Sequence, residues 1–328
     1  MTSATALPGT IRTLRPQSPA VSARAVVRRH GNGRGVGPID IDVFTGETLA
    51  LMGRNGCGKT TLLRLLATVS RPRGGRLRWF GGAAGPARSH IGMALDSALE
   101  DPGLTGRQAT HFWCAQWIAD RHAVVARTDA ILHRLGIAAT ADEPVASYSF
   151  GMRRRLALAA ALVHEPALAL LDEPTAGLDP QGCGQLAGLL RARSHDGRST
   201  VVASNDAGFV EEVADRVAFI EEGELVRCAT PRELLAGLPR GRIADLVVDA
   251  GGGAAAAPAA TLRAVTGVLD VRAEGAALTV RFTDDRAVAA IVAAADAPGG
   301  RLRELRLRRP DLGDCFTVLT GRPLREGS

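Results

Sequence analysis

Gly53-Arg54-Asn55-Gly56-Cys57-Gly58-Lys59-Thr60 is the stretch of sequence that decides the fold of this chain. A continuous apolar run over 48–52, suited to a buried parallel strand, precedes it, and helical spacing follows over 61–68. The glycines let backbone N–H groups wrap phosphate oxygens at the start of a helix. Strand, loop and helix together predict an α/β fold of the P-loop NTPase class. A glycine-rich turn with a chance Lys-Thr pair is the alternative.

The residues of this loop have separate expected roles in holding ATP and Mg²⁺. Lys59 would reach the outer phosphates, and the Thr60 hydroxyl would ligate magnesium. Lys59 is also the only lysine among the 40 basic residues of the chain, and it stands where a compact ammonium suits better than an arginine fork. The remaining nucleotide contacts are expected from Gly53, Arg54, Asn55, Gly56, Cys57, Gly58 and Thr61.

A second motif ends in paired acidic residues. Leu168-Ala169-Leu170-Leu171-Asp172-Glu173 is an apolar run that stops at two carboxylates. Asp172, at the end of a buried strand, can hold magnesium through water, and Glu173 is then placed to polarise a water that attacks the γ-phosphate. A strand that simply ends in solvated acids is the alternative. The residues that follow, 174–180, favour the catalytic interpretation through the resemblance described below.

Charge and cysteine content narrow the classes of protein to which the chain can belong. The net charge is +6, but aromatic residues make up only 4% and no basic block has interleaved aromatics, so we expect no nucleic acid partner. The five cysteines are scattered without metal-like spacing, which predicts reduced thiols rather than disulfides. Because Cys57 lies inside the loop, we expect its alkylation to block nucleotide binding.

The chain divides into three predicted parts. Residues 1–20 contain three prolines and lack a signal-peptide apolar core, so we expect a disordered tail. Residues 21–240 form the nucleotide-binding domain, with an inserted helical subdomain at about 97–165. Residues 241–328 show a separate βαββαβ pattern with a final helix, which predicts a small α+β, ferredoxin-like domain. No apolar stretch reaches the roughly 20 residues that span a bilayer, so we expect a cytoplasmic protein.

Periodicity and turn residues predict the individual elements. In the nucleotide-binding domain we expect strands at 21–30, at 38–53 with a turn at 45–47, and at 167–171, 199–203 and 217–220, with a helix around 208–214. In the C-terminal domain we expect strands at 243–249, 268–273, 277–283 and 301–308, and helices at 258–266, 285–296 and 311–320.

These motifs together resemble one family. Asp-Glu-Pro-Thr-Ala-Gly-Leu-Asp-Pro at 172–180 is similar to the Walker B motif and D-loop of ATP-binding cassette (ABC) transporter ATPases. Tyr-Ser-Phe-Gly-Met-Arg-Arg-Arg-Leu at 148–156 resembles their signature motif. The resemblance covers about residues 21–235. The segment 307–322 resembles the C-terminal domain of the daunorubicin-resistance type of drug-exporter ATPase.

The resemblance implies a head-to-tail dimer, either homodimer or heterodimer, with each ATP between one subunit's phosphate loop and its partner's signature motif. Ser149 and the Gly151 backbone would then touch the γ-phosphate of the partner's ATP, and Asp179 of the D-loop would lie at the same interface. An N-cap is a compatible second role for Ser149. The resemblance also implies a separate integral membrane permease, with the chain bound at the inner face of the cell membrane.

Four positions depart from the family pattern. Phe150 fills the middle place of a Ser-Gly-Gly sequence. Asp96 stands where a glutamine contacts magnesium and the attacking water, and a carboxylate there is shorter but can still ligate a cation. Asn205 occupies the place of a histidine that senses the γ-phosphate, and it cannot carry the proton that imidazole can. His30 stands where an aromatic residue stacks on adenine; an ordinary surface histidine is the alternative.

Three functions fit these observations. The first is the ATP-hydrolysing subunit of an ABC exporter of drugs or secondary metabolites, with slow turnover because of Asp96 and Asn205. The second is a regulatory ATP-binding subunit that hydrolyses weakly beside a more active ATPase. The third, a cassette ATPase acting on ribosomes or DNA, fits poorly because such proteins commonly carry two cassettes or a long coiled-coil insertion.

Overall fold

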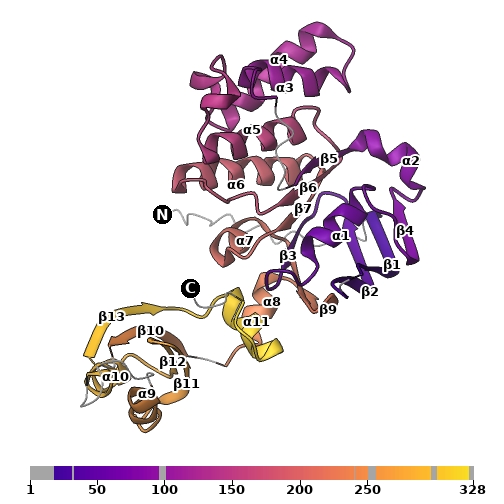
Figure 1. The fold of residues 1–328 in the computed structure, drawn as a ribbon. Helices are drawn as coiled ribbons and strands as arrows, with labels where there is room; N and C mark the ends of the chain where they lie inside the picture. Colours follow the sequence, from indigo (N-terminus) through magenta and orange to yellow (C-terminus); the bar gives the residue numbers. More distant parts are fainter. Residues whose placement is uncertain are drawn as a thin grey trace, which may run out of the picture.

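The computed structural model describes residues 18–31, 33–95, 101–239, 241–249, 256–296 and 301–324. Figure 1 shows a group of helices, α3 to α6, at one end of the molecule, a strand-rich centre that holds β3, β6 and β7, and the strands β10 to β13 at the other end. Across the described residues, no helix is long and apolar enough to cross a membrane.

A six-stranded sheet forms the centre. Its strand order is β5-β6-β7-β3-β8-β9, parallel except for the last pair. All residues of β3, β6 and β7 are buried, as unbroken apolar runs predict for parallel strands covered on both faces. The strands are β3 (Thr48–Met52), β5 (Ile91–Ala94), β6 (Leu168–Asp172), β7 (Ser199–Ala203), β8 (Arg216–Glu221) and β9 (Glu224–Ala229).

Different layers cover the two faces of this sheet. α1 (Lys59–Leu66) packs on one face, where Leu62 shares a core with Leu51 and Leu170. On the other face, α6 (Pro180–His195) contributes Leu186 to a second core, and α7 (Ala207–Val213) lies beside it. Alternate residues of each strand therefore belong to different cores, which fixes the sheet between its layers.

A three-stranded antiparallel sheet covers α1. Its order is β2-β1-β4, made of β1 (Pro19–Arg29), β2 (Gly35–Phe44) and β4 (Gly74–Trp79). The expectation of a disordered tail through residue 20 is wrong at its end, because Pro19 starts β1 and is aligned with Phe44. A proline is tolerated there because the first residue of a strand need not donate to the ladder. Residues 1–17 lie outside the described part of the chain.

Helices occupy most of the described residues between β5 and β6, as the sequence predicts for an inserted helical segment. Thr105, Asp120 and Ser149 each accept a hydrogen bond from the first turn of the helix that they cap. Residues 96–100, where this segment would begin, are not among the described ones. The helices are α2 (Ala84–Ala87, between β4 and β5), α3 (Gly106–Ala115), α4 (Arg121–Arg134) and α5 (Phe150–Leu162).

The C-terminal elements follow the predicted βαββαβ order. The strands form a four-stranded antiparallel sheet in the order β11-β12-β10-β13, and the helices α9 and α10 share its core. The elements are α8 (Pro231–Ala236), β10 (Arg242–Asp249), α9 (Ala256–Arg263), β11 (Val268–Glu274), β12 (Ala277–Phe282), α10 (Ala287–Ala295), β13 (Arg301–Arg308) and α11 (Leu312–Thr320).

The last helix, α11, packs on the nucleotide-binding part rather than on the sheet that precedes it (Figure 1). Phe316 meets Phe219 of β8 edge to face, with ring centroids 5.6 Å apart. Leu312 and Phe316 are fully buried in a core with Met52 of β3 and Val210 of α7. The chain after residue 241 therefore contributes to two cores, and a boundary at 240 stays a prediction.

Candidate functional site

The loop between β3 and α1 has two positions, Gly53 and Gly58, at which only glycine fits. A Cβ on Gly53 would lie 2.0 Å from the Ile220 carbonyl oxygen. Gly58 has a φ of 114°, and a Cβ there would lie 2.5 Å from the Gly35 carbonyl oxygen. Strand β8 and the start of β2 thus hold the loop closely, and α1 begins directly after it.

Lys59 and Thr60 connect the loop to the neighbouring strand end. Lys59 is buried, and its ammonium donates to the carbonyl of Gly53 and, at 3.4 Å, to that of Arg54. The Thr60 hydroxyl donates to the Asp172 carboxylate at 2.7 Å. A cation, a hydroxyl and a carboxylate thus lie together at the positive N-terminus of α1, which suits a phosphate with a bound cation.

Glu173 sits in a sharp bend directly after β6. Its φ of 42° is in the left-handed region that non-glycine residues rarely adopt. The backbone N–H of Glu173 donates to the Ala203 carbonyl of β7 at 2.8 Å. Burial raises the pKa of the Glu173 carboxyl, and the nearby Asp172 carboxylate adds to this, whereas Lys59 acts in the opposite direction.

Asn205 follows β7 and reaches both the loop and the acidic residue. Its side-chain oxygen accepts from the Gly53 N–H at 3.3 Å. A hydrogen bond from its backbone to the Glu173 carboxylate holds the pKa of that carboxyl down. The structure therefore brings the predicted switch residue to the loop and to Glu173, as its place in the sequence suggests.

Lys59, Thr60, Asp172 and Glu173 line a cavity of about 330 Å³, whereas Gly53 and Asn205 are not part of its lining. His30 lies at its edge, with its Nε2 3.4 Å from the Thr61 hydroxyl. Two lining residues, Arg34 and Gly35, escaped the sequence analysis because they lie in the glycine-rich stretch that leads into β2, which carries no motif. The predicted site residues that line the cavity are His30, Asn55, Gly56, Gly58, Lys59, Thr60, Thr61, Asp172 and Glu173.

Arg54 and Cys57 line a larger depression on the outer side of the loop, against the end of α11. Cys57 is buried, and burial raises the pKa of its thiol. All five cysteines are free, as their spacing predicts. Asp96 falls outside the described residues, so the structure says nothing of its place.

Ser149, Gly151 and Asp179 do not line the cavity. Ser149 caps α5 by accepting from the Met152 N–H at 3.2 Å. Asp179 caps α6 by accepting from the Gly182 N–H at 3.0 Å. These residues, predicted to act on a partner's nucleotide, therefore lie away from the cavity of their own chain.

The start of α5 packs against the segment after β6. A Cβ on Gly151 would lie 2.4 Å from the Gly177 carbonyl oxygen, so only glycine fits this approach. The Phe150 ring covers Gly177, although its side chain is 62% exposed. Phe150 thus fills the middle place of the signature motif without entering the core.

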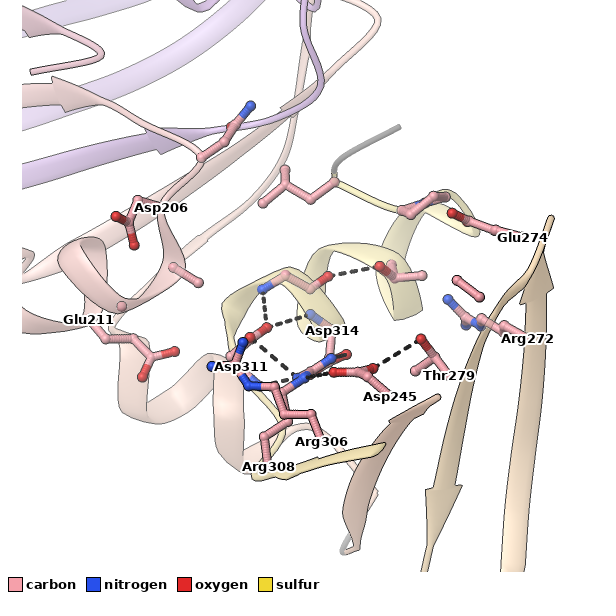
Figure 2. Close-up of a pocket in the computed structure, with 18 residues that line it drawn as sticks. Asp206, Glu211, Asp245, Arg272, Glu274, Thr279, Arg306, Arg308, Asp311 and Asp314 are labelled. Carbon is pink, nitrogen blue, oxygen red and sulfur yellow. Dashed lines mark hydrogen bonds and ion pairs between the residues drawn. The ribbon is translucent and has the colours of Figure 1, made fainter. Parts of the chain in front are cut away.

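A second cavity, of about 670 Å³, separates α7 from the C-terminal sheet (Figure 2). Arg308 is at its centre and pairs with Asp245 at 2.6 Å and with Asp314 at 2.6 Å (Figure 2). Glu211 of α7 accepts from the Leu312 N–H at 3.2 Å. Among the described residues, Asn205 is the one predicted site residue that lines this cavity, and Arg308 there pairs with the carboxylates of Asp245, Asp311 and Asp314.

Comparison with known proteins gives one consistent result. The family model described as "ABC transporter" matches residues 36–176. A daunorubicin resistance ATP-binding protein of Streptomyces coeruleorubidus is 33% identical over 306 residues, covering 92% of this chain and 96% of the relative. A linearmycin resistance ATP-binding protein of Bacillus subtilis is 27% identical, covering 93% of this chain and 100% of the relative.

Solved structures match the nucleotide-binding part. The cbiO1 protein of Clostridium perfringens, part of an ABC transporter complex, aligns with a TM-score of 0.59 and 27% identity, over 67% of this chain and 92% of its own. An ATP-binding cassette solved as a dimer with ADP and phosphate aligns with a TM-score of 0.59 over 64% of this chain and 98% of its own. At 21% identity, that second likeness shows the fold alone.

Proposed function

This chain belongs to the ATP-binding subunits of ABC transporters, and from that premise we propose that it drives the export of drugs or secondary metabolites through a separate membrane permease. The family is one of ATPases, so the chain binds and hydrolyses ATP. The observation that carries the proposal is the meeting of Lys59, Thr60, Asp172 and Glu173 at one cavity. Lys59 and Thr60 begin α1, and Asp172 and Glu173 lie at the end of β6, more than 100 residues later in sequence. Their residue types suit phosphoryl transfer to water.

Lys59 and the N–H groups of the loop would hold the outer phosphates. The hydroxyl of Thr60 and the carboxylate of Asp172 are the residues that would hold Mg²⁺. They fit the ion because Mg²⁺ takes one or two protein oxygens and completes its shell with phosphates and water. The ion would neutralise charge on the phosphate oxygens during transfer.

Glu173 is the group that would polarise the attacking water. Its side chain lines the cavity, and a carboxylate in its ionised form accepts the proton of such a water. Asn205 would contact the γ-phosphate from the end of β7, and Asp96 would take the role of the family's glutamine. Asn205 cannot carry the proton that the family's histidine can, and the Asp96 carboxylate is shorter than glutamine although it can still ligate a cation, so we propose slow turnover.

Two chains would close on each other head to tail. Ser149 and Gly151 at the start of α5, and Asp179 beside them, would then reach the partner's ATP, which their position outside their own cavity supports. His30 would lie against the adenine. Whether the dimer pairs two copies of this chain or two different subunits follows from the permease with which it assembles.

The helical segment offers a surface for the permease. Phe112 and Trp117, at and just after α3, are 52% and 46% exposed, and Val125 on α4 is 51% exposed. Large apolar side chains exposed on one small helical segment suit a protein partner. Binding there would place the chain at the inner face of the membrane. The names of the relatives, daunorubicin and linearmycin resistance proteins, support a drug as cargo.

The test is the ATPase rate of the chain purified with its permease, measured with and without drug, against Glu173→Gln. Loss of a general base lowers turnover by about 100-fold or more, so we expect that drop with ATP binding unchanged. Equal rates in the two proteins would sink the role of Glu173. A low rate in both, with tight ATP binding, would favour the regulatory subunit instead, which Asn205 also fits.

A further inference from the structure

Arg154 lies on the second turn of α5 with its side chain directed into the molecule. It is only 7% exposed, whereas Arg153 beside it is exposed. Leu158 and Leu162 follow at helical spacing on the same buried face. A guanidinium is rarely buried this deeply, because removing its charge from water is unfavourable unless acceptors replace the water.

The acceptors in this structure are the backbone carbonyls at the end of β6. One terminal nitrogen of Arg154 donates to the carbonyl oxygen of Asp172 and, at 2.7 Å, to that of Glu173. The guanidinium therefore bridges the helix of the signature motif and the two acidic residues of the cavity. Its positive charge also favours the ionised form of Glu173 and so helps lower the pKa of that carboxyl.

The hydrogen bond from Arg154 to the Glu173 carbonyl is made at a residue whose backbone angles are unfavourable. Glu173 has left-handed backbone angles, which are unfavourable for a glutamate and persist only where surrounding contacts fix them. Its N–H is held by the Ala203 carbonyl of β7, and its carbonyl by Arg154 of α5. This bend directs the side chain from the strand end into the cavity, so the two bonds together determine where the carboxylate points.

We propose that Arg154 is a positioning residue that holds Glu173 in its hydrolytic orientation through the two carbonyls of residues 172 and 173. The inference rests on the proposed role of Glu173 as the group that orients water. The proposed positioning role also makes the orientation of Glu173 depend on the helix that carries the signature motif. The helix that begins at Ser149, facing the partner's ATP in the proposed dimer, also carries the arginine that orients Glu173 of its own chain.

The experiment compares Arg154→Met and Arg154→Lys in the full chain with its permease. Methionine keeps an unbranched apolar stem but removes every donor, whereas lysine keeps one cationic donor that can reach two carbonyls. We expect kcat to fall about 30-fold in Arg154→Met, because small misplacement of a reacting group has effects of this size. We expect the Kd for ATP to change less than about threefold, since Arg154 donates to the backbone carbonyls of Asp172 and Glu173, whereas the phosphates and the cation would be held by Lys59, Thr60 and the Asp172 carboxylate. We expect lysine to restore most of kcat.

Arg191→Met on α6 is the matched control. It removes an arginine whose pairing with Glu212, at 2.7 Å, lies on the surface, and it should leave kcat unchanged. A second measurement repeats each Arg154 variant in a Glu173→Gln background, where a residue that acts only through Glu173 has no further effect. If Arg154→Met does not fold, Arg154→Gln in the two backgrounds provides the same test, because glutamine removes the charge and shortens the side chain while keeping a polar group.

The outcomes separate the two proposals. If Glu173→Gln turns over as fast as the unaltered chain, the proposed function of Glu173 fails. If Glu173→Gln is slow but Arg154→Met keeps kcat within threefold, only the positioning role fails. The positioning role also fails if Arg154→Met weakens ATP binding as much as kcat, or lowers turnover further in the Glu173→Gln background.

Discussion

The phosphate loop and the end of β7 differ in how closely their residues match the family. We call these two regions the loop side and the far side. On the loop side, Lys59 and Thr60 are already held by Gly53 and Asp172, and each residue type is the one that the family uses. On the far side, at the end of β7 and outside the lining of the cavity, the side-chain oxygen of Asn205 accepts from the Gly53 N–H at 3.3 Å, where the family has an imidazole. If the proposed roles hold, the difference teaches that the residues proposed to bind phosphate keep the family's residue types, whereas a residue proposed to set the rate of hydrolysis differs from the family while the loop keeps its hydrogen bonds.

The strongest way to break this comparison is Lys59→Ala. Charge-assisted hydrogen bonds to phosphate are worth about 1.5–3 kcal/mol, so we expect the Kd for ATP to rise about 100-fold. Isothermal titration calorimetry measures this directly. Thermal unfolding without nucleotide is the control, because the variant also leaves the Gly53 carbonyl without its lysine donor. A Kd within threefold of the unaltered chain would contradict the importance of the loop side.

Asn205→His tests the far side. An imidazole can carry the proton and charge that an amide cannot, so we expect turnover to increase by about tenfold while ATP binding stays the same. Single-turnover hydrolysis of labelled ATP is the measurement. Asn205→Ala is the companion variant, which removes the acceptor for Gly53 N–H and should not increase turnover. No gain in Asn205→His would mean that the far side is not what limits the rate.

Cys57 reports whether the loop side opens. Cys57 is only 7% exposed, and this burial raises the pKa of its thiol. Both effects slow alkylation, because the thiolate is the reactive form. We expect iodoacetamide at pH 8 to alkylate Cys57 at least about tenfold more slowly than free glutathione, by peptide mass spectrometry. Once alkylated, the loop should no longer bind ATP. Rapid modification would show that the loop is not held as closely as Gly53 and Gly58 indicate.

Phe150→Gly should have the smallest effect. It restores the family residue in the signature motif, and the lost ring is 62% exposed, so little buried area disappears. Glycine in the first turn of α5 weakens the helix by about 1 kcal/mol or less, and we expect ATPase activity within about threefold. The assay is the same drug-stimulated turnover. A change above tenfold would assign Phe150 a role at the contact between subunits.

Strand positions at the centre of the fold were predictable because each buried parallel strand is a short unbroken apolar run. The predicted strand at 199–203 has the bounds of β7, and that at 167–171 differs from β6 by one residue at each end. Helix α6 was not anticipated, because Gly182, Gly184 and Gly188 interrupt its pattern with poor helix formers. The signals were Asp179 and Pro180, an N-cap followed by proline at the first helical position.

The candidate site was predictable where its residues are neighbours in sequence. The loop and the acidic pair each form a local pattern, but their meeting at the cavity depends on strand order. The role of Arg154 was not predicted, because three arginines follow one another at 153–155 and residue type alone does not distinguish the buried one. Its spacing to Leu158 and Leu162 was an available signal, since it places Arg154 on the buried face of α5.

The single lysine has a consequence for handling the protein. Apart from its α-amino group, the chain has one primary amine, and it is buried against the Gly53 carbonyl. Amine-reactive cross-linkers therefore have no surface lysine through which to capture the permease, and coupling this chain to a sensor chip through lysine would attach it by its nucleotide site. Carboxylate- or cysteine-directed chemistry is the appropriate route to its neighbours.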